Sequence, residues 1–71
     1  MIINNAKDAQ RYINTGIGAG YIRLAVEGLE MSSAIMYSAR DRYSADRIMD
    51  MREAIGALRL QYFRMTGKAV V

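Results

Sequence analysis

Arginine and tyrosine are the residue types in this 71-residue chain whose chemistry most favours a binding role. Eight of its ten basic residues are Arg, the side chain that interfaces, carboxylates and phosphates favour over Lys. Two groups set Arg beside Tyr: Arg11 and Tyr12 form one, and Arg40, Arg42 and Tyr43 form the other. Because aromatic rings and Arg groups anchor protein contact surfaces, we predict partner binding at these positions. We favour the second group, which falls in a short connector.

Catalytic chemistry has few candidates in the chain. It contains no His and no Cys, so imidazole acid–base chemistry, thiolate chemistry and the usual zinc ligand sets are missing. The Ser and Thr hydroxyls have no base to activate them. Asp46, Asp50 and Glu53 share one face of a predicted helix, as metal-binding carboxylates would, but a solvated outer face is the simpler interpretation. We therefore expect no enzymatic activity, no cofactor and no metal site.

The glycine-rich stretch G-I-G-A-G at 16–20 does not complete a nucleotide-binding motif. A dinucleotide fingerprint needs a third Gly where Tyr21 stands, and a preceding strand that the sequence does not predict. A glycine inside a helix costs about 1 kcal/mol relative to Ala. We therefore predict a break or kink here, with Thr15 capping the helix that follows. The alternative to a break is a continuous but weakened helix. Gly20 and Gly28 could also allow two helices to approach closely.

The strongest helical pattern covers residues 45–65. Its apolar positions recur at spacings of three and four, as one face of a helix requires: Ile48, Met51, Ile55, Leu58, Tyr62 and Met65. Ser44 stands at the N-cap position and Gly67 just past the last turn, which are common start and stop signals. A second stripe on this helix carries Met49, Gly56, Leu60 and Phe63.

Two further helices are predicted before it, over residues 5–13 and 17–40. Asn5 is the expected N-cap of the first. The second is apolar around most of its circumference, which implies cover on more than one side. One set of positions is Ile17, Tyr21, Leu24, Gly28, Met31, Ile35 and Ala39. The other set is Ile22, Val26, Leu29, Met36 and Tyr37.

These elements predict an all-α antiparallel helical hairpin with a short N-terminal helical extension, assembled as a dimeric helical bundle. Two helices alone leave a large apolar surface uncovered, and such surface usually marks an interface. We predict that the following residues form an interface between subunits: Ile22, Val26, Leu29, Met36, Leu60 and Phe63. The segment 5–13 overhangs the hairpin, so it must fold back as a third helix or reach across a partner subunit.

Charged side chains leave two interpretations open. Arg52 and Arg59 are seven residues apart, and we expect them to pair with Glu27 and Glu30 on the neighbouring helix, in a register that places Arg59 near Glu27. The alternatives are contacts with phosphate and binding hot spots for a partner. Basic side chains would also gather at one end of an antiparallel hairpin: Lys7, Arg11, Arg64 and Lys68. A cluster of that kind is a potential phosphate footprint.

The function predicted from these features is that of a non-enzymatic interaction module. We expect a small homo-oligomer that binds and modulates or inhibits a partner protein, of the size typical of phage or mobile-element accessory proteins. The alternative is a small RNA- or DNA-binding regulator built on a dimeric helical bundle. The longest uncharged run, 12–22, is well short of the roughly 18 residues of a membrane span, so we expect a cytoplasmic protein.

Overall fold

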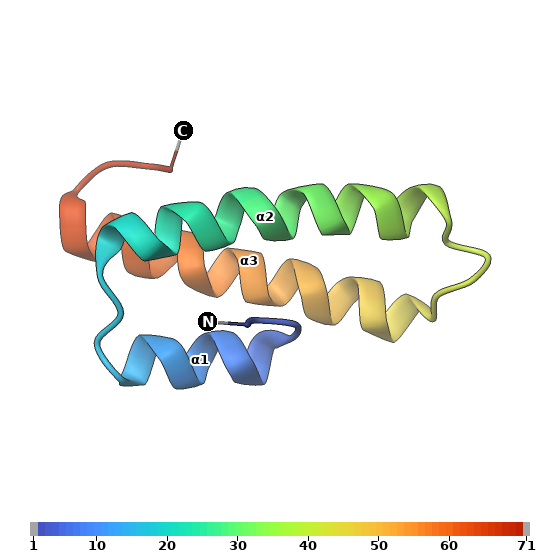
Figure 1. Cartoon of the computed structure of the whole chain (residues 1–71), viewed down its shortest axis with the longest axis horizontal. Helices are drawn as coiled ribbons and strands as arrows, with labels where there is room; N and C mark the ends of the chain where they lie inside the picture. Colours follow the sequence, from blue (N-terminus) through green and yellow to red (C-terminus); the bar gives the residue numbers. More distant parts are fainter. Residues whose placement is uncertain (1, 71) are drawn as a thin grey trace.

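Three α-helices make up the fold (Figure 1). The computed structural model describes residues 2–70, in which α1 covers Ala6–Asn14, α2 covers Ala19–Ser38 and α3 covers Ala45–Thr66. Residues 2–70 contain no β-strand, so the prediction of an all-α chain is confirmed. The predicted ranges 5–13, 17–40 and 45–65 differ from these bounds by two residues at most.

Side-chain and glycine caps define the helix ends. The Asn5 side chain accepts a hydrogen bond from the Asp8 N–H at 2.8 Å, which caps the start of α1. Ser44 does the same for α3 by accepting from the Arg47 N–H at 3.2 Å. Gly67 ends α3 in the left-handed conformation, with a φ of 73° that glycine adopts without a steric penalty. All three caps occupy the positions predicted from the sequence.

The predicted break between the first two helices lies at residues 15–18, where Gly16 has a φ of 82°. Thr15 does not cap α2, as the sequence suggested. Its hydroxyl donates instead to the Tyr12 carbonyl oxygen at 2.8 Å, so Thr15 finishes α1. Gly18 takes the N-cap position of α2 without a side-chain hydrogen bond, because the tight link from Gly16 to Gly18 leaves Thr15 too far back in the chain.

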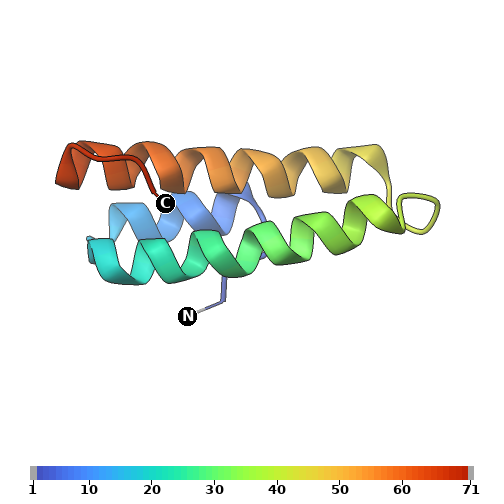
Figure 2. The same ribbon diagram turned by 90° about the horizontal axis from the view of Figure 1, so that it is seen from above.

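The two long helices lie side by side and run in opposite directions, with the chain reversing at residues 39–44 (Figures 1 and 2). The short α1 lies towards the opposite end of the molecule from that turn and packs against α3 (Figures 1 and 2). Just before α1, the side chain of Ile3 is buried and borders a hollow on α2 beside Leu29. The N-terminal segment therefore ties α2 and α3 together.

The core lies between α2 and α3, and α1 closes part of it. Its buried side chains are Ile3, Ala9, Ile22, Val26, Leu29, Met36, Met51, Ala54 and Leu58. Four of them, Ile22, Val26, Leu29 and Met36, were expected at an interface between subunits. That expectation is corrected, because α3 and Ile3 cover this side of α2 within one chain. The other two predicted interface residues, Leu60 and Phe63, are about half exposed.

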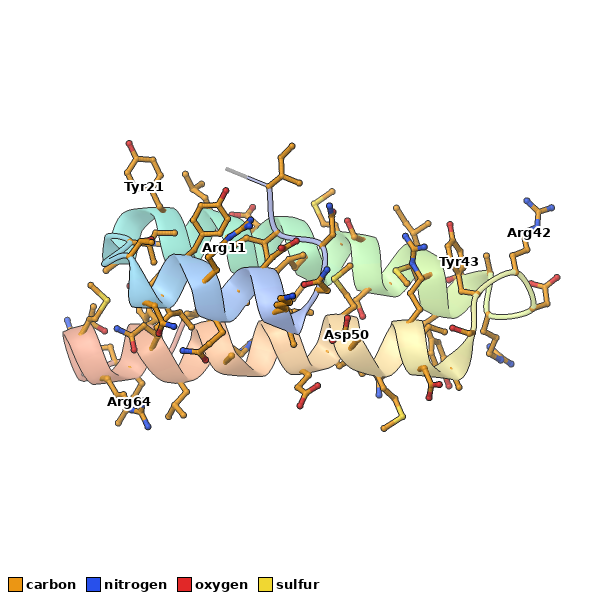
Figure 3. All side chains as sticks on the ribbon, turned by 90° about the horizontal axis from the view of Figure 1, so that it is seen from below. Arg11, Tyr21, Arg42, Tyr43, Asp50 and Arg64 are labelled. Atoms are coloured by element: carbon orange, nitrogen blue, oxygen red, sulfur yellow. The ribbon has the colours of Figure 1, made fainter. Side chains whose placement is uncertain are left out.

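One carboxylate also differs from its predicted place. Asp50 was expected on the outer face of α3, yet it is half-buried and points to the beginning of α1 (Figure 3). Its Oδ1 accepts a hydrogen bond from the Ala6 N–H at 3.2 Å. The N–H groups of a first helical turn lack partners within the helix, and the helix dipole favours a negative charge there. Asp50 therefore anchors α1 to α3.

Candidate interaction site

An extensive apolar surface lies on the side of α2 that faces away from the core. We call it the α2 outer face and define it by five residues at alternating spacings of three and four: Tyr21, Leu24, Gly28, Met31 and Ile35. Tyr21, Leu24, Met31 and Ile35 are each about two-thirds exposed. In Figure 3 the Tyr21 side chain projects away from the rest of the molecule. None of the five carries a charge.

The other helices cover only the opposite side of α2, so the α2 outer face stays open. One edge of it, at Leu24 and Gly28, borders the hollow beside Ile3. A Cβ atom added at Gly28 would meet no atom within 4 Å. The close helix approach considered for Gly20 and Gly28 therefore does not occur within one chain. The charged residues of α2, which are Arg23, Glu27 and Glu30, border a separate hollow shared with Arg59 of α3. The uncharged face and the charged side of α2 are thus distinct surfaces.

A second surface is the cleft at the end of the molecule where the chain turns from α2 into α3. We call it the turn-end cleft. Its volume is about 350 Å³ and its lining residues are Tyr37, Arg40, Tyr43, Ala45, Ile48, Met49 and Arg52. They come from the last turn of α2, the connector and the first two turns of α3. The lining combines apolar side chains with two guanidinium groups and includes no carboxylate.

Cation–π contacts order the arginines of this cleft. The Cζ atoms of Arg40 and Arg52 lie 5.1 Å and 5.5 Å from the centre of the Tyr37 ring. Arg40 Nη1 also lies 3.5 Å from the Tyr37 carbonyl oxygen. Contacts of this kind are worth roughly 0.5–1 kcal/mol at exposed sites. They hold the two long side chains over one aromatic ring.

The predicted partner-binding residues fall into separate places. Arg40 and Tyr43 line the turn-end cleft, whereas Arg42 projects away from the tip of the connector (Figure 3). Arg11 and Tyr12 lie on α1, where Arg11 pairs with Asp8 at 3.4 Å and Tyr12 packs against the core. The structure therefore does not bring the two predicted groups together.

Tyr37, Met49 and Arg52 also line the cleft, although they were not among the favoured partner-binding residues. The alignment of α2 against α3 is the feature that could have predicted the contact between Arg52 and Tyr37. Arg59 forms an ion pair with Glu30, and Arg52 and Tyr37 each lie seven residues away from those two partners. Seven residues are two helical turns, so the pairing of Arg59 with Glu30 brings Arg52 to Tyr37 on the same side. The predicted register placed Arg59 nearer to Glu27 and missed this contact.

The predicted basic end does not form around Arg11 and Arg64. In Figure 3, Arg64 projects from the side of α3 that faces away from α1, while Arg11 lies on the opposite side of α3. Arg11 is also partly neutralised by Asp8. A phosphate backbone following one side of the molecule would therefore meet only one of these two arginines.

Within residues 2–70, no three Asp or Glu side chains gather in a way that could hold a metal ion. None of the three helices in this range has both the length and the apolar character that a membrane crossing requires. Comparison of the chain with protein-family models, curated proteins and solved structures found no match in any of the three.

Proposed function

We propose that this protein is a non-enzymatic, self-associating helical module that binds another protein and modulates or inhibits it. The α2 outer face is the observation that carries the proposal. Its four large apolar side chains remain about two-thirds exposed although the chain has a well-formed core. Contiguous apolar surface of this kind on a single subunit is typical of interaction sites.

A second copy of the chain is the occupant that suits the α2 outer face. Positions 21, 24, 28, 31 and 35 alternate at spacings of three and four, which is the pattern of a helix that packs along another helix. A two-fold axis would bring the same face of both copies together. Because the face has no charged residue, no like charges would meet inside the contact.

We therefore still propose a dimeric helical bundle, but with a different face of α2 at the contact between subunits. Ile22, Val26, Leu29 and Met36 stabilise each subunit from within, and the α2 outer face joins the subunits. Leu60 and Phe63 lie on α3 and remain about half exposed. They are available for a higher oligomer without being part of the proposed dimer contact.

Partner binding is assigned to the turn-end cleft, in agreement with the preference for the connector over α1. Arg40 and Arg52 are already held against Tyr37, so a partner would immobilise fewer free side chains on binding. Each side chain that needs no further ordering saves about 0.5–1.5 kcal/mol of the cost of association. Arg11 and Tyr12 are less suited, because Arg11 already pairs with Asp8.

Two methionines offer a matched test of self-association. Met31 on the α2 outer face and Met49 in the turn-end cleft are 65% and 66% exposed. Sedimentation equilibrium at micromolar concentration should give the wild-type chain at least twice its 8.0 kDa mass. Met31→Asp should give the monomer mass, because a charge would be buried in the contact, and Met49→Asp should keep the wild-type mass.

Circular dichroism of both variants is the control for folding, and both should keep the helical signal of the wild-type chain. A wild-type chain that sediments as a monomer at every concentration would contradict the proposed self-association. Dissociation caused by Met49→Asp with Met31→Asp unaffected would show that the contact lies at the turn end instead.

A further inference from the structure

We infer that the turn-end cleft binds an acidic segment of a partner protein that carries one large apolar side chain. This inference rests on the proposed partner-binding role of the cleft and adds the chemical class of the partner. The observations behind it are the apolar lining of the cleft, its two arginines and the position of nearby carboxylates.

The apolar part of the cleft accounts for the large side chain of the partner. Ala45, Ile48 and Met49 supply aliphatic and thioether groups from the first turns of α3, and the lining also includes the rings of Tyr37 and Tyr43. A volume of about 350 Å³ is at the lower end of the range for ligand sites in proteins. Flexible thioethers adapt well to apolar groups of different shape.

The two arginines of the cleft explain why the partner segment should be acidic. Residues 2–70 contain ion pairs at Arg11 and Arg59 and none at Arg40 or Arg52. Both guanidinium groups lie over the Tyr37 ring. Stacking uses the flat surface of a guanidinium group and leaves its N–H edge able to donate to a carboxylate in a paired arrangement. The cleft thus presents two ordered donors that form no ion pair within residues 2–70.

Two other occupants fit the same cleft less well. Asp41 follows Arg40 directly and Asp46 follows Ala45, and both are exposed. A continuous phosphate backbone would meet these carboxylates, whereas a short peptide can avoid them. A second copy placed symmetrically over the cleft would bring the arginines of the two chains together, and like charges across a contact are unfavourable.

A peptide titration followed by NMR tests the inference with the full chain. The probe is a short capped peptide with a central phenylalanine flanked by Asp and Glu, and the reporters are the methyl signals of Met49 and Met31. The Met49 signal should shift saturably and the Met31 signal should not. Replacing the flanking residues by Asn and Gln should weaken binding by about tenfold or more, which is the loss of a charge-assisted contact.

Two matched arginine variants complete the test. Arg52→Gln should weaken binding of the acidic peptide by about tenfold. Arg59→Gln, on the same helix but outside the cleft, should change it less than twofold. If both variants weakened peptide binding equally, general attraction between opposite charges would explain the binding, and the inference would be overturned.

The remaining outcomes separate this inference from the proposed function. Binding at Met49 that is equally strong for the Asn and Gln peptide would overturn the acidic class and leave the cleft as a protein-binding site. Absence of any Met49 shift would overturn the cleft as the binding site, while sedimentation would still report on self-association. A DNA oligonucleotide that shifts Met49 more strongly than the acidic peptide would overturn the inference in favour of nucleic acid.

Discussion

The α2 outer face and the turn-end cleft both expose apolar side chains, and they differ in charge and shape. Met31 and Met49 are almost equally exposed, so exposure alone does not distinguish the two surfaces. The five residues of the α2 outer face carry no charge and come from one helix, whereas the cleft is lined from two helices and the connector and has arginines at its wall. Apolar exposure indicates that a surface binds, and the charge around it restricts which partner can bind there.

Shortening a side chain to Ala should change the free energy of unfolding much more on the inner face of α2 than on its outer face. Ile22 is fully buried and Leu24 on the opposite side is 65% exposed. Ile22→Ala should lower the free energy of unfolding by about 2–5 kcal/mol, the usual cost of a cavity in a core. Leu24→Ala should change it by less than about 0.5 kcal/mol at protein concentrations too low for assembly.

Urea denaturation under those dilute conditions measures both values. A similar loss of stability in the two variants would show that Leu24 belongs to the interior of a single chain. The same pair should reverse in sedimentation experiments at high concentration, where Leu24→Ala weakens the assembly and any folded fraction of Ile22→Ala retains it.

Sequence patterns predicted the helices more reliably than the faces that those helices bury. Asn5, Ser44 and Gly67 are local signals, and each acts where the sequence places it. The direction in which α2 faces is not a local property. Its two sides both carry regularly spaced apolar residues, so periodicity cannot decide whether Ile22 or Leu24 is buried. Cover from α3 and Ile3 decides it.

Only part of the candidate site could be predicted from the sequence, for a related reason. Arg40 and Tyr43 are close in sequence, and their common location in the connector was evident. Arg52 and Tyr37 meet only through the register of two helices, and an error of three residues in that register hides the contact. Asp50 illustrates the same point, because its role depends on where α1 folds back.

Asp50, which anchors α1 to α3, lies outside the α2 outer face and the turn-end cleft, so its replacement should alter neither surface. Asp50→Ala should lower the free energy of unfolding by about 1–2 kcal/mol, since the Ala6 N–H loses its charged acceptor. Hydrogen exchange should show the loss chiefly at the amides of α1. The exposed Glu53 on the same helix is the matched control. If Glu53→Ala lowered the free energy of unfolding equally, the change in net charge would explain the loss, and the hydrogen bond of Asp50 would not.

Gly28 and Gly56 lie at the centres of α2 and α3 and offer a matched pair of substitutions. A Cβ atom at Gly28 or Gly56 would meet no atom within 4 Å in one chain. Each Gly→Ala change should therefore raise the stability of the dilute protein by about 0.5–1 kcal/mol in thermal or urea unfolding. Gly28→Leu should weaken self-association, whereas Gly56→Leu should leave the mass of the assembly unchanged.

The ion pair between Arg59 and Glu30 should have the smallest effect. Both side chains are about half exposed, and exposed pairs contribute about 0–1 kcal/mol. Arg59→Gln should lower the free energy of unfolding by no more than that amount, and added salt should reduce the difference. A loss of several kcal/mol that persists in high salt would mean that this contact is buried in the assembled protein.

Isotope-filtered NMR on a mixture of labelled and unlabelled chains is the decisive test of self-association through the α2 outer face, because it detects only contacts between copies. Self-association through this face requires contacts between copies at the methyl groups of Leu24, Met31 and Ile35. It requires none at Ile22 and Val26, which pack within one chain. Contacts between copies confined to Met49, Leu60 or Phe63, with none on the α2 outer face, would contradict it.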